Sequence, residues 1–298
     1  MSIAGNHCLD WGEKALLDTR EYLSAAGMEV CGAGRNIEEA RRPAFIRSGS
    51  ITIAILAYSS VLPHGYWAES SRPGCAPMRA HTIYDNGENV LQSGSVQVIT
   101  FPYRDDLAAL VCDIRNAKQV ADMVLVSMHW GIHFTPAEIA DYQRDVAHAV
   151  IDAGAEMVIG HHPHILKGVE IYSGKPIFYS LGNFAIEQPF AFKEGLEEDE
   201  SFREIVALNP DWNNESKYKA PPDTRKTFIV NCQLSKNGIS DLNLIPCFIN
   251  DNAEPEILSR KDPRFTEVVY YLDEITASQK LKPEFAVKGN KVSIEPYC

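Results

Sequence analysis

Apolar segments that predict strands alternate with segments that predict helices through the middle of this chain, and this order restricts the fold more than any other feature. Residues 51–57 (ITIAILA) are rich in branched apolar side chains and predict a buried strand. Shorter apolar runs at 123–128 and 157–159 predict two more strands, and apolar residues at helical spacing in 105–119 and 136–153 predict the helices between them. This order is typical of a layered α/β protein with a mostly parallel sheet.

The flanking segments extend this layout. We expect a helix over 13–26, a hairpin over 168–181, a second hairpin built from 227–234 and 239–249, and a helix over 263–277. Two segments, 59–95 and 186–224, show no clear periodicity. The first predicts an irregular surface excursion and the second a long, acidic, solvated loop or lid.

Two histidine-bearing motifs directly follow predicted strands. His129 comes after the strand at 123–128, and His162 and His164 follow the next strand on a turn that contains Pro163. Ligands in open α/β sheets gather outside the carboxyl ends of the strands, and neutral imidazole is the commonest metal ligand in proteins. The sequence therefore predicts a metal site at one edge of the sheet.

Other interpretations of these polar residues stay open. His162 and His164 could instead lie in a hydrogen-bonded loop, and Asn6 could cap the first helix, although it lies far upstream of it. Four further histidines are interpreted as surface or hydrogen-bonded residues rather than ligands: His64, His81, His133 and His148. Of these, His133 could still reach the site, because it follows His129 by only four positions.

Composition and charge limit the classes of function. With 298 residues, 45% of them hydrophobic, the chain can bury a substantial core. Its formal charge of -12 argues against general binding to nucleic acid or to anionic membranes. The absence of a long apolar run and of a signal-peptide pattern predicts a cytoplasmic location for the chain as given. Seven cysteines without a CxxC pair predict reduced thiols.

Five short motifs in a fixed order resemble the CapA family of capsule and poly-γ-glutamate synthesis proteins, which has the calcineurin-like metallophosphatase fold. The resemblance runs from about residue 3 to residue 184 and rests on residues 6–12 (NHCLDWG), 32–34 (GAG), 129–131 (HWG), 160–164 (GHHPH) and 179–184 (YSLGNF). It implies an α/β sandwich of mixed sheets flanked by helices, with the first strand region missing. We expect one such domain over residues 1–250, and a C-terminal helix and hairpin extension over 251–298 that packs on it.

The resemblance also implies roles for individual residues. Asn6 and His129 would be ligands to one metal, and His162 and His164 would supply one imidazole to each of two metals. His7 would be the catalytic residue that contacts the substrate phosphate. Two divalent cations can clamp a phosphoryl group, and these ligands suit manganese, zinc, iron or cobalt.

Two more residues would lie around that site. Asp10 would orient the Asn-His turn from behind the ligands, and Asn183 would lie at the edge of the site. His161 falls at a variable position of the family motif, and we assign it no coordination.

This chain departs from the family pattern at its start. Family members carry carboxylates upstream of the Asn-His motif, whereas no Asp or Glu precedes Asp10 here. The metal-bridging carboxylate thus has no counterpart, and two cations among neutral ligands would repel each other. We expect one or two ions, with the second in doubt. Either the polypeptide begins further upstream, which we favour because residues 2–4 resemble the end of a buried strand, or the site is mononuclear or vestigial.

Two functions follow from the resemblance. The first is a metal-dependent hydrolase of the phosphoesterase type, acting on a small phosphoester or on an anionic polymer. The alternative is a non-catalytic component of polymer synthesis or assembly that binds polymer through a vestigial site. Other capsule-synthesis proteins would be partners in both cases. The sequence has no membrane segment, but a membrane anchor would be expected if an upstream region had been lost.

Overall fold

The structure is a computed structural model that describes residues 1–85, 97–186, 200, 203–204, 207, 217–218 and 220–295. The chain forms two compact units, which are described separately. The first unit comprises Met1–Gly131, Ile139–Gly160 and Lys175–Ile177, and the second comprises Ile132–Glu138, His161–Gly174 and Phe178–Cys298. The domain boundary predicted at residue 250 stays a prediction.

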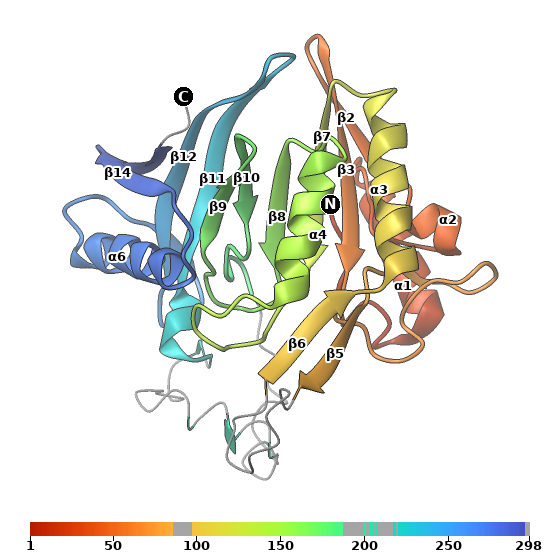
Figure 1. The fold of residues 1–298 in the computed structure, drawn as a ribbon, viewed down its shortest axis with the longest axis horizontal. Helices are drawn as coiled ribbons and strands as arrows, with labels where there is room; N and C mark the ends of the chain where they lie inside the picture. Colours follow the sequence, from red (N-terminus) through yellow and green to blue (C-terminus); the bar gives the residue numbers. More distant parts are fainter. Residues whose placement is uncertain are drawn as a thin grey trace. The chain divides into compact units, whose positions relative to one another are not determined.

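A mixed sheet forms the centre of the first unit (Figure 1). Its strands β2 (Ala44–Ser48), β3 (Ile51–Ser59), β7 (Met123–His129) and β8 (Met157–His161) lie in that order. β3 runs parallel to β7 as predicted, whereas β2 is antiparallel to β3. The parallel register pairs Ser59 with His129, so β3 and β7 end side by side. The predicted strands are therefore confirmed, and the sheet is mixed.

The described residues of the first unit form four helices: α1 (Gly12–Ala25), α2 (Ile37–Ala40), α3 (Arg104–Lys118) and α4 (Asp141–Asp152). Figure 1 shows α3 and α4 next to each other along the strands. The helix predicted over 136–153 is wrong at its start, because Ala137 has a positive φ of 58° and α4 begins only at Asp141. The Gln143 side chain accepts a hydrogen bond from the Ala140 amide at 3.0 Å and satisfies a donor at the start of the helix.

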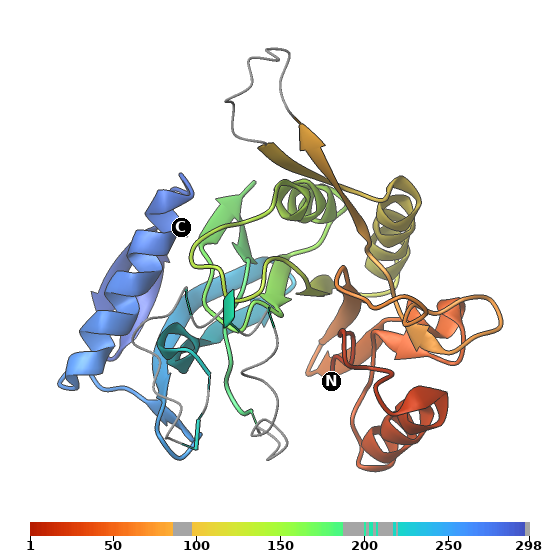
Figure 2. The same cartoon turned by 90° about the horizontal axis from the view of Figure 1, so that it is seen from below.

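A two-stranded ribbon stands apart from the main sheet of this unit. It consists of β5 (Ala80–Asp85) and β6 (Gln97–Pro102), which pair antiparallel (Figure 2). The prediction of an irregular excursion over 59–95 is therefore wrong at residues 80–85, while 86–95 lie outside the described residues. Most side chains of β5 are exposed, so the strand lacks the apolar alternation by which strands are recognised in a sequence.

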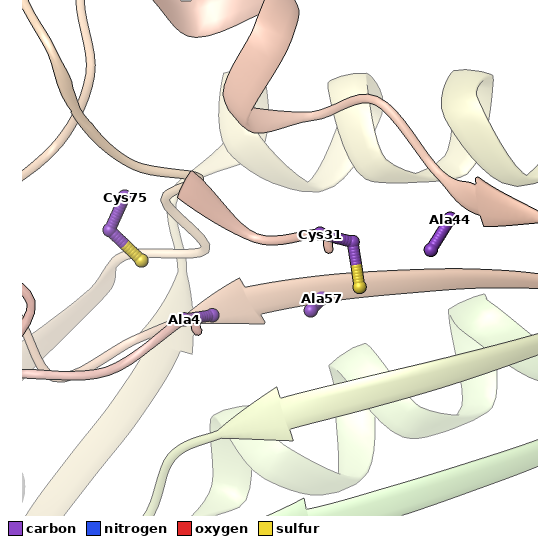
Figure 3. Packing of buried hydrophobic residues seen from close by; sticks show 5 residues of the cluster. All are labelled: Ala4, Cys31, Ala44, Ala57 and Cys75. Atoms are coloured by element: carbon purple, nitrogen blue, oxygen red, sulfur yellow. The ribbon is translucent and has the colours of Figure 1, made fainter. Parts of the chain in front are cut away.

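Small side chains pack tightly where the chain enters the Asn-His motif. Ala4, Cys31, Ala44, Ala57 and Cys75 form one buried cluster (Figure 3). Gly32, in the GAG motif, has a φ of 97°, and a Cβ added there would lie 2.8 Å from the Ala4 Cβ. This close approach requires glycine and fixes the backbone two residues before Asn6. β1 (Ala33–Gly34) then pairs antiparallel with β4 (Gly74–Cys75).

An antiparallel sheet dominates the second unit. Its strand order is β11 (Lys226–Ser235), β12 (Gly238–Ile249), β15 (Lys291–Glu295) and β14 (Glu284–Lys288), and β13 (Pro255–Ile257) also pairs with β12. The predicted hairpin is confirmed, and Gly238 takes the positive φ that its tight turn needs. The predicted helix is α6 (Pro263–Ser278), which packs on β12 (Figure 2).

Three shorter elements complete the description. The strands β9 (Val169–Tyr172) and β10 (Lys175–Phe178) form where the first hairpin was predicted, and a short 3-10 helix, η3 (Pro222–Arg225), precedes β11. Within the described ranges, no helix is both long enough and apolar enough to cross a membrane.

Candidate metal-binding and catalytic residues

The first unit brings Asn6 and His129 together. His129 is the last residue of β7, and its carbonyl oxygen accepts a hydrogen bond from the Ser60 amide at 2.9 Å. The His129 Nε2 atom lies 2.8 Å from the Asn6 Oδ1 atom. The Asn-His turn passes directly over this imidazole, because a Cβ added to Gly5 would lie 3.5 Å from the His129 Cε1 atom. Asn6 and His129, which were predicted to bind one metal, thus lie in contact at the carboxyl end of a strand, and their role as ligands stays a prediction.

The two residues after His129 hold it in place. Trp130 is fully buried, so its indole anchors the end of β7 in the core. Gly131 has a φ of 90° and donates its amide to the Tyr142 hydroxyl at 2.8 Å. A Cβ at this position would lie 2.7 Å from the Gln143 Nε2 atom. In the HWG motif, His129 thus faces Asn6, Trp130 fills space in the core, and Gly131 takes a backbone conformation that favours glycine.

His7 is oriented by a carboxylate. Its Nδ1 atom donates to the Asp10 Oδ2 atom at 2.8 Å, and the Tyr66 hydroxyl donates to the other Asp10 oxygen at 3.3 Å. The His7 Nε2 atom accepts a hydrogen bond of 3.3 Å from the Asn6 amide nitrogen. Because the His7 side chain is exposed, a substrate group can reach this imidazole from solvent. Asp10 thus contacts His7 in the Asn-His turn, and its supporting role in a metal site stays a prediction.

The second unit gathers three histidines. The imidazole of His133 stacks on that of His162, with ring centroids 5.1 Å apart, and lies 5.1 Å from that of His164. His162 and His164 have positive φ values of 104° and 59°, and the Pro163 carbonyl between them accepts the Phe134 amide at 3.0 Å. Such conformations are uncommon for residues other than glycine and cluster at functional sites. The turn thus holds both predicted ligands in an unusual backbone conformation.

Asn183 supports one of these histidines from behind. The His164 Nδ1 atom lies 2.6 Å from the Asn183 Oδ1 atom, and the Asn183 amide nitrogen donates to the Tyr218 hydroxyl at 2.8 Å. Metal-binding histidines commonly donate their second ring nitrogen to a protein acceptor in this way. The neighbouring His161 differs, because burial first, and then the charge of His164, lowers the pKa of His161 to about 4. It is therefore neutral at pH 7.

Three residues in these groups escaped the sequence analysis. His133 was predicted to be a surface or hydrogen-bonded histidine, although its position four residues after His129 was a signal. Tyr218 and Thr224 gave no signal, because they fall in the segment predicted to be a solvated loop, yet both are fully buried. That prediction is wrong at these two positions, and residues 187–199 of the same segment lie outside the described residues.

The chemistry of the donors fits a divalent metal in part. Asn6 Oδ1 and His129 Nε2 face each other at 2.8 Å, and an amide oxygen and an imidazole nitrogen are both atoms that bind divalent metals. Within the ranges that the structure describes, no group of three or more His, Cys, Asp or Glu side chains is arranged to hold a metal. The two histidine groups lie in different units, and the prediction that they share one site stays a prediction.

The fold and these residues define a class of protein, an α/β protein with mixed sheets flanked by helices that is compatible with a metallophosphatase-like fold. Residues 1–188 match the family described as "Bacterial capsule synthesis protein PGA_cap". This chain is a member of that family, as the CapA resemblance predicted.

Named relatives agree with this membership. The PGA biosynthesis protein CapA of Bacillus subtilis is 31% identical over 63% of this chain and 42% of its own length. A probable polyglutamine synthesis accessory protein of Mycobacterium tuberculosis is 34% identical over 70% of this chain and 49% of its own. The capsule biosynthesis protein CapA of Bacillus anthracis is 24% identical over 88% of this chain and 50% of its own. The chain spans about half the length of these relatives.

Proposed function

We propose that this chain is a metal-dependent hydrolase of the phosphoesterase type that takes part in capsule or poly-γ-glutamate synthesis. The pairing of Asn6 Oδ1 with His129 Nε2 at the end of β7 is the observation that carries the chemical part of this proposal. The names of the relatives, which refer to capsule and PGA biosynthesis, support the biological process and suggest other capsule-synthesis proteins as partners.

The ligands proposed for divalent metal are neutral in both units. Asn6 and His129 would serve in the first unit, and His162 and His164 in the second. Manganese, zinc, iron or cobalt suits an amide oxygen and imidazoles. When bound, such an ion supplies positive charge that polarises a phosphoryl oxygen and stabilises the transition state.

His7 is the proposed catalytic residue. Asp10 accepts the Nδ1 proton and fixes the orientation of the ring, so the Nε2 atom is the one available to the substrate. In the neutral form Nε2 accepts from the Asn6 amide nitrogen, so the imidazole must first take up a proton from solvent at Nε2. In this imidazolium form the Nε2–H donates to a phosphate oxygen in place of the Asn6 contact, and it can pass its proton to the leaving oxygen and return to the neutral form. A small phosphoester or an anionic polymer is the proposed substrate.

A second candidate function is polymer binding without turnover. The neutrality of the four proposed ligands favours it, because no carboxylate among them offsets the charge of two cations. The formal charge of -12 in turn disfavours binding of a polyanion unless metal intervenes. Metal content and hydrolysis must therefore be measured together.

The test compares the purified chain with His129→Ala and with His148→Ala as the matched control on helix α4. Each protein is incubated with manganese or zinc and desalted, its metal is measured by elemental analysis, and hydrolysis of a phosphodiester and of poly-γ-glutamate is assayed. Metal and hydrolysis lost in His129→Ala but kept in the control would support the hydrolase. Bound metal and bound polymer without hydrolysis would favour the second candidate. Equal metal content in all three proteins would overturn the assignment of His129.

A further inference from the structure

A buried chain of hydrogen bonds leads away from His164. The His164 Nδ1 atom is 2.6 Å from the Asn183 Oδ1 atom, and the Asn183 amide nitrogen is 2.8 Å from the Tyr218 hydroxyl. That hydroxyl lies 3.0 Å from the Thr224 carbonyl oxygen and 2.9 Å from its Oγ1 atom. The Thr224 hydroxyl donates in turn to the Pro221 carbonyl oxygen at 2.5 Å. All five residues belong to the second unit.

This series of hydrogen bonds ends deep in the protein. Tyr218 and Thr224 have no exposed surface, and Asn183 is 7% exposed. Buried polar groups of this kind must find partners within the protein, because an unmatched buried donor or acceptor destabilises the fold. The direction of each hydrogen bond is therefore decided by its neighbours.

The directions can be assigned from the Thr224 end. The hydroxyl hydrogen of Thr224 goes to the Pro221 carbonyl, so the single hydrogen of the Tyr218 hydroxyl goes to Thr224. The Tyr218 oxygen must then accept from the Asn183 amide nitrogen. This leaves the Asn183 oxygen facing His164, and an oxygen acceptor at that position requires a hydrogen on the His164 Nδ1 atom.

Two further contacts favour the same arrangement. Burial raises the pKa of Tyr218, so its side chain stays a neutral phenol that can donate a hydrogen bond. The Arg225 guanidinium lies over the Tyr218 ring, 4.8 Å from its centroid, and helps to hold the ring. The orientation of Tyr218 is thus fixed from its face as well as from its hydroxyl.

We propose that Tyr218 is a positioning residue for His164, which orients the Asn183 amide so that the imidazole keeps its proton on Nδ1 and presents the lone pair of Nε2 to a divalent metal. The metal part of this inference rests on the proposed function, whereas the position of the proton does not. Neither Tyr218 nor Thr224 touches the metal or the substrate in this arrangement.

The position of the proton can be measured without metal. Long-range ¹H–¹⁵N correlation spectra of the metal-free protein, recorded at about pH 8, distinguish the Nδ1–H from the Nε2–H form of a neutral histidine, and His164→Gln assigns the signals. We expect His164 to be in the Nδ1–H form. In Tyr218→Phe the Asn183 amide loses its acceptor, and we expect a mixture of both forms. Thr224→Val is the matched control, because the Thr224 carbonyl oxygen remains as an acceptor for Tyr218.

Metal affinity is the second measurement. Zinc titration by calorimetry should show about tenfold weaker binding to Tyr218→Phe than to Thr224→Val, because loss of such a supporting contact weakens metal binding about 10–100-fold. If Tyr218→Phe does not fold, Asn183→Leu takes its place in both measurements, because it removes the oxygen through which the Tyr218 contact reaches His164.

The outcomes separate this inference from the proposed function. A mixture of forms with weaker zinc binding supports both. A mixture of forms in a protein that binds no metal supports the role of Tyr218 and overturns the proposed metal site. An unchanged Nδ1–H form in Tyr218→Phe, or an Nε2–H form in the unsubstituted protein, overturns the inference whatever the metal content.

Discussion

The Asn6 Oδ1 atom and the His129 Nε2 atom are 2.8 Å apart, although 123 positions separate the two residues in the chain. The contact exists because β7 ends at His129 and because Gly5 lets the Asn-His turn lie directly against the imidazole. Both side chains are neutral polar groups, so the pair has no charge with which to attract a cation. This property leads to the first prediction.

Asn6→Asp should strengthen binding of divalent metal, because a carboxylate in place of the amide supplies a negative charge to the ion. We expect about tenfold tighter binding of manganese or zinc, which corresponds to about 1.4 kcal/mol. Calorimetric titration of the purified proteins measures the change. Asn36→Asp is the control, since Asn36 caps helix α2 and an aspartate caps equally well. Equal affinities for the two variants would contradict a metal ligand at position 6.

Gly131→Ala should destabilise the protein more than Gly174→Ala. Both glycines have a positive φ, so both substitutions carry a backbone cost of about 1 kcal/mol. A Cβ at Gly131 also meets the Gln143 side chain at 2.7 Å, whereas nothing lies within 4 Å of a Cβ at Gly174. We expect an additional loss of about 1–3 kcal/mol in the free energy of unfolding of Gly131→Ala, measured in urea. Equal losses would mean that Gln143 moves aside freely.

Asp106→Ala should lower the free energy of unfolding by about 2 kcal/mol or more. The Asp106 carboxylate is buried, forms two hydrogen bonds of 2.8 Å with the Arg79 guanidinium, and also accepts the Arg79 amide. Removing it leaves these donors without their charged acceptor. Asp18→Ala, which breaks an exposed ion pair with Lys14, should change stability by well under about 1 kcal/mol. Similar losses in both variants would rule out a special contribution from Asp106.

Lys167 should make the stability of the protein depend on pH in the alkaline range. Its side chain is 1% exposed, its Nζ atom donates to the carbonyl oxygens of Thr135 and Glu138, and burial lowers its pKa from 10.5 to about 8. Between pH 8 and 10.5 the unfolded chain therefore binds more protons than the folded chain, so stability rises with pH in that window. Below pH 8 Lys167 is charged in the folded and in the unfolded chain, so burial of the charge lowers the free energy of unfolding by a constant amount.

This effect is measured as a difference between two proteins. The free energy of unfolding of the unsubstituted protein, minus that of Lys167→Met, should rise by about 3 kcal/mol from pH 8 to pH 10.5. Tyrosines and cysteines that ionise in the same range contribute equally to both proteins and cancel. A difference that stays flat, or falls, over this window would show that Lys167 keeps an ordinary pKa.

Local sequence patterns predicted the regular elements well where one face is buried. The strand at 51–57, the helix at 105–119 and the hairpin through Asn237-Gly238 all form, because burial imposes a period of two or 3.6 on the apolar residues and a tight turn requires a positive φ. The same approach failed at β5, whose side chains are mostly exposed, and at 136–140, where a positive φ at Ala137 delays the start of α4.

The sequence by itself determined the family, through short motifs in a fixed order, and named Asn6, His7, His129, His162 and His164 as candidate site residues. Only the tertiary structure decided the partners of these residues. The stacking of His133 on His162 and the contact of Asn183 with Tyr218 join segments far apart in the chain. Such contacts depend on how distant elements pack, which leaves no periodic trace in the sequence around either residue.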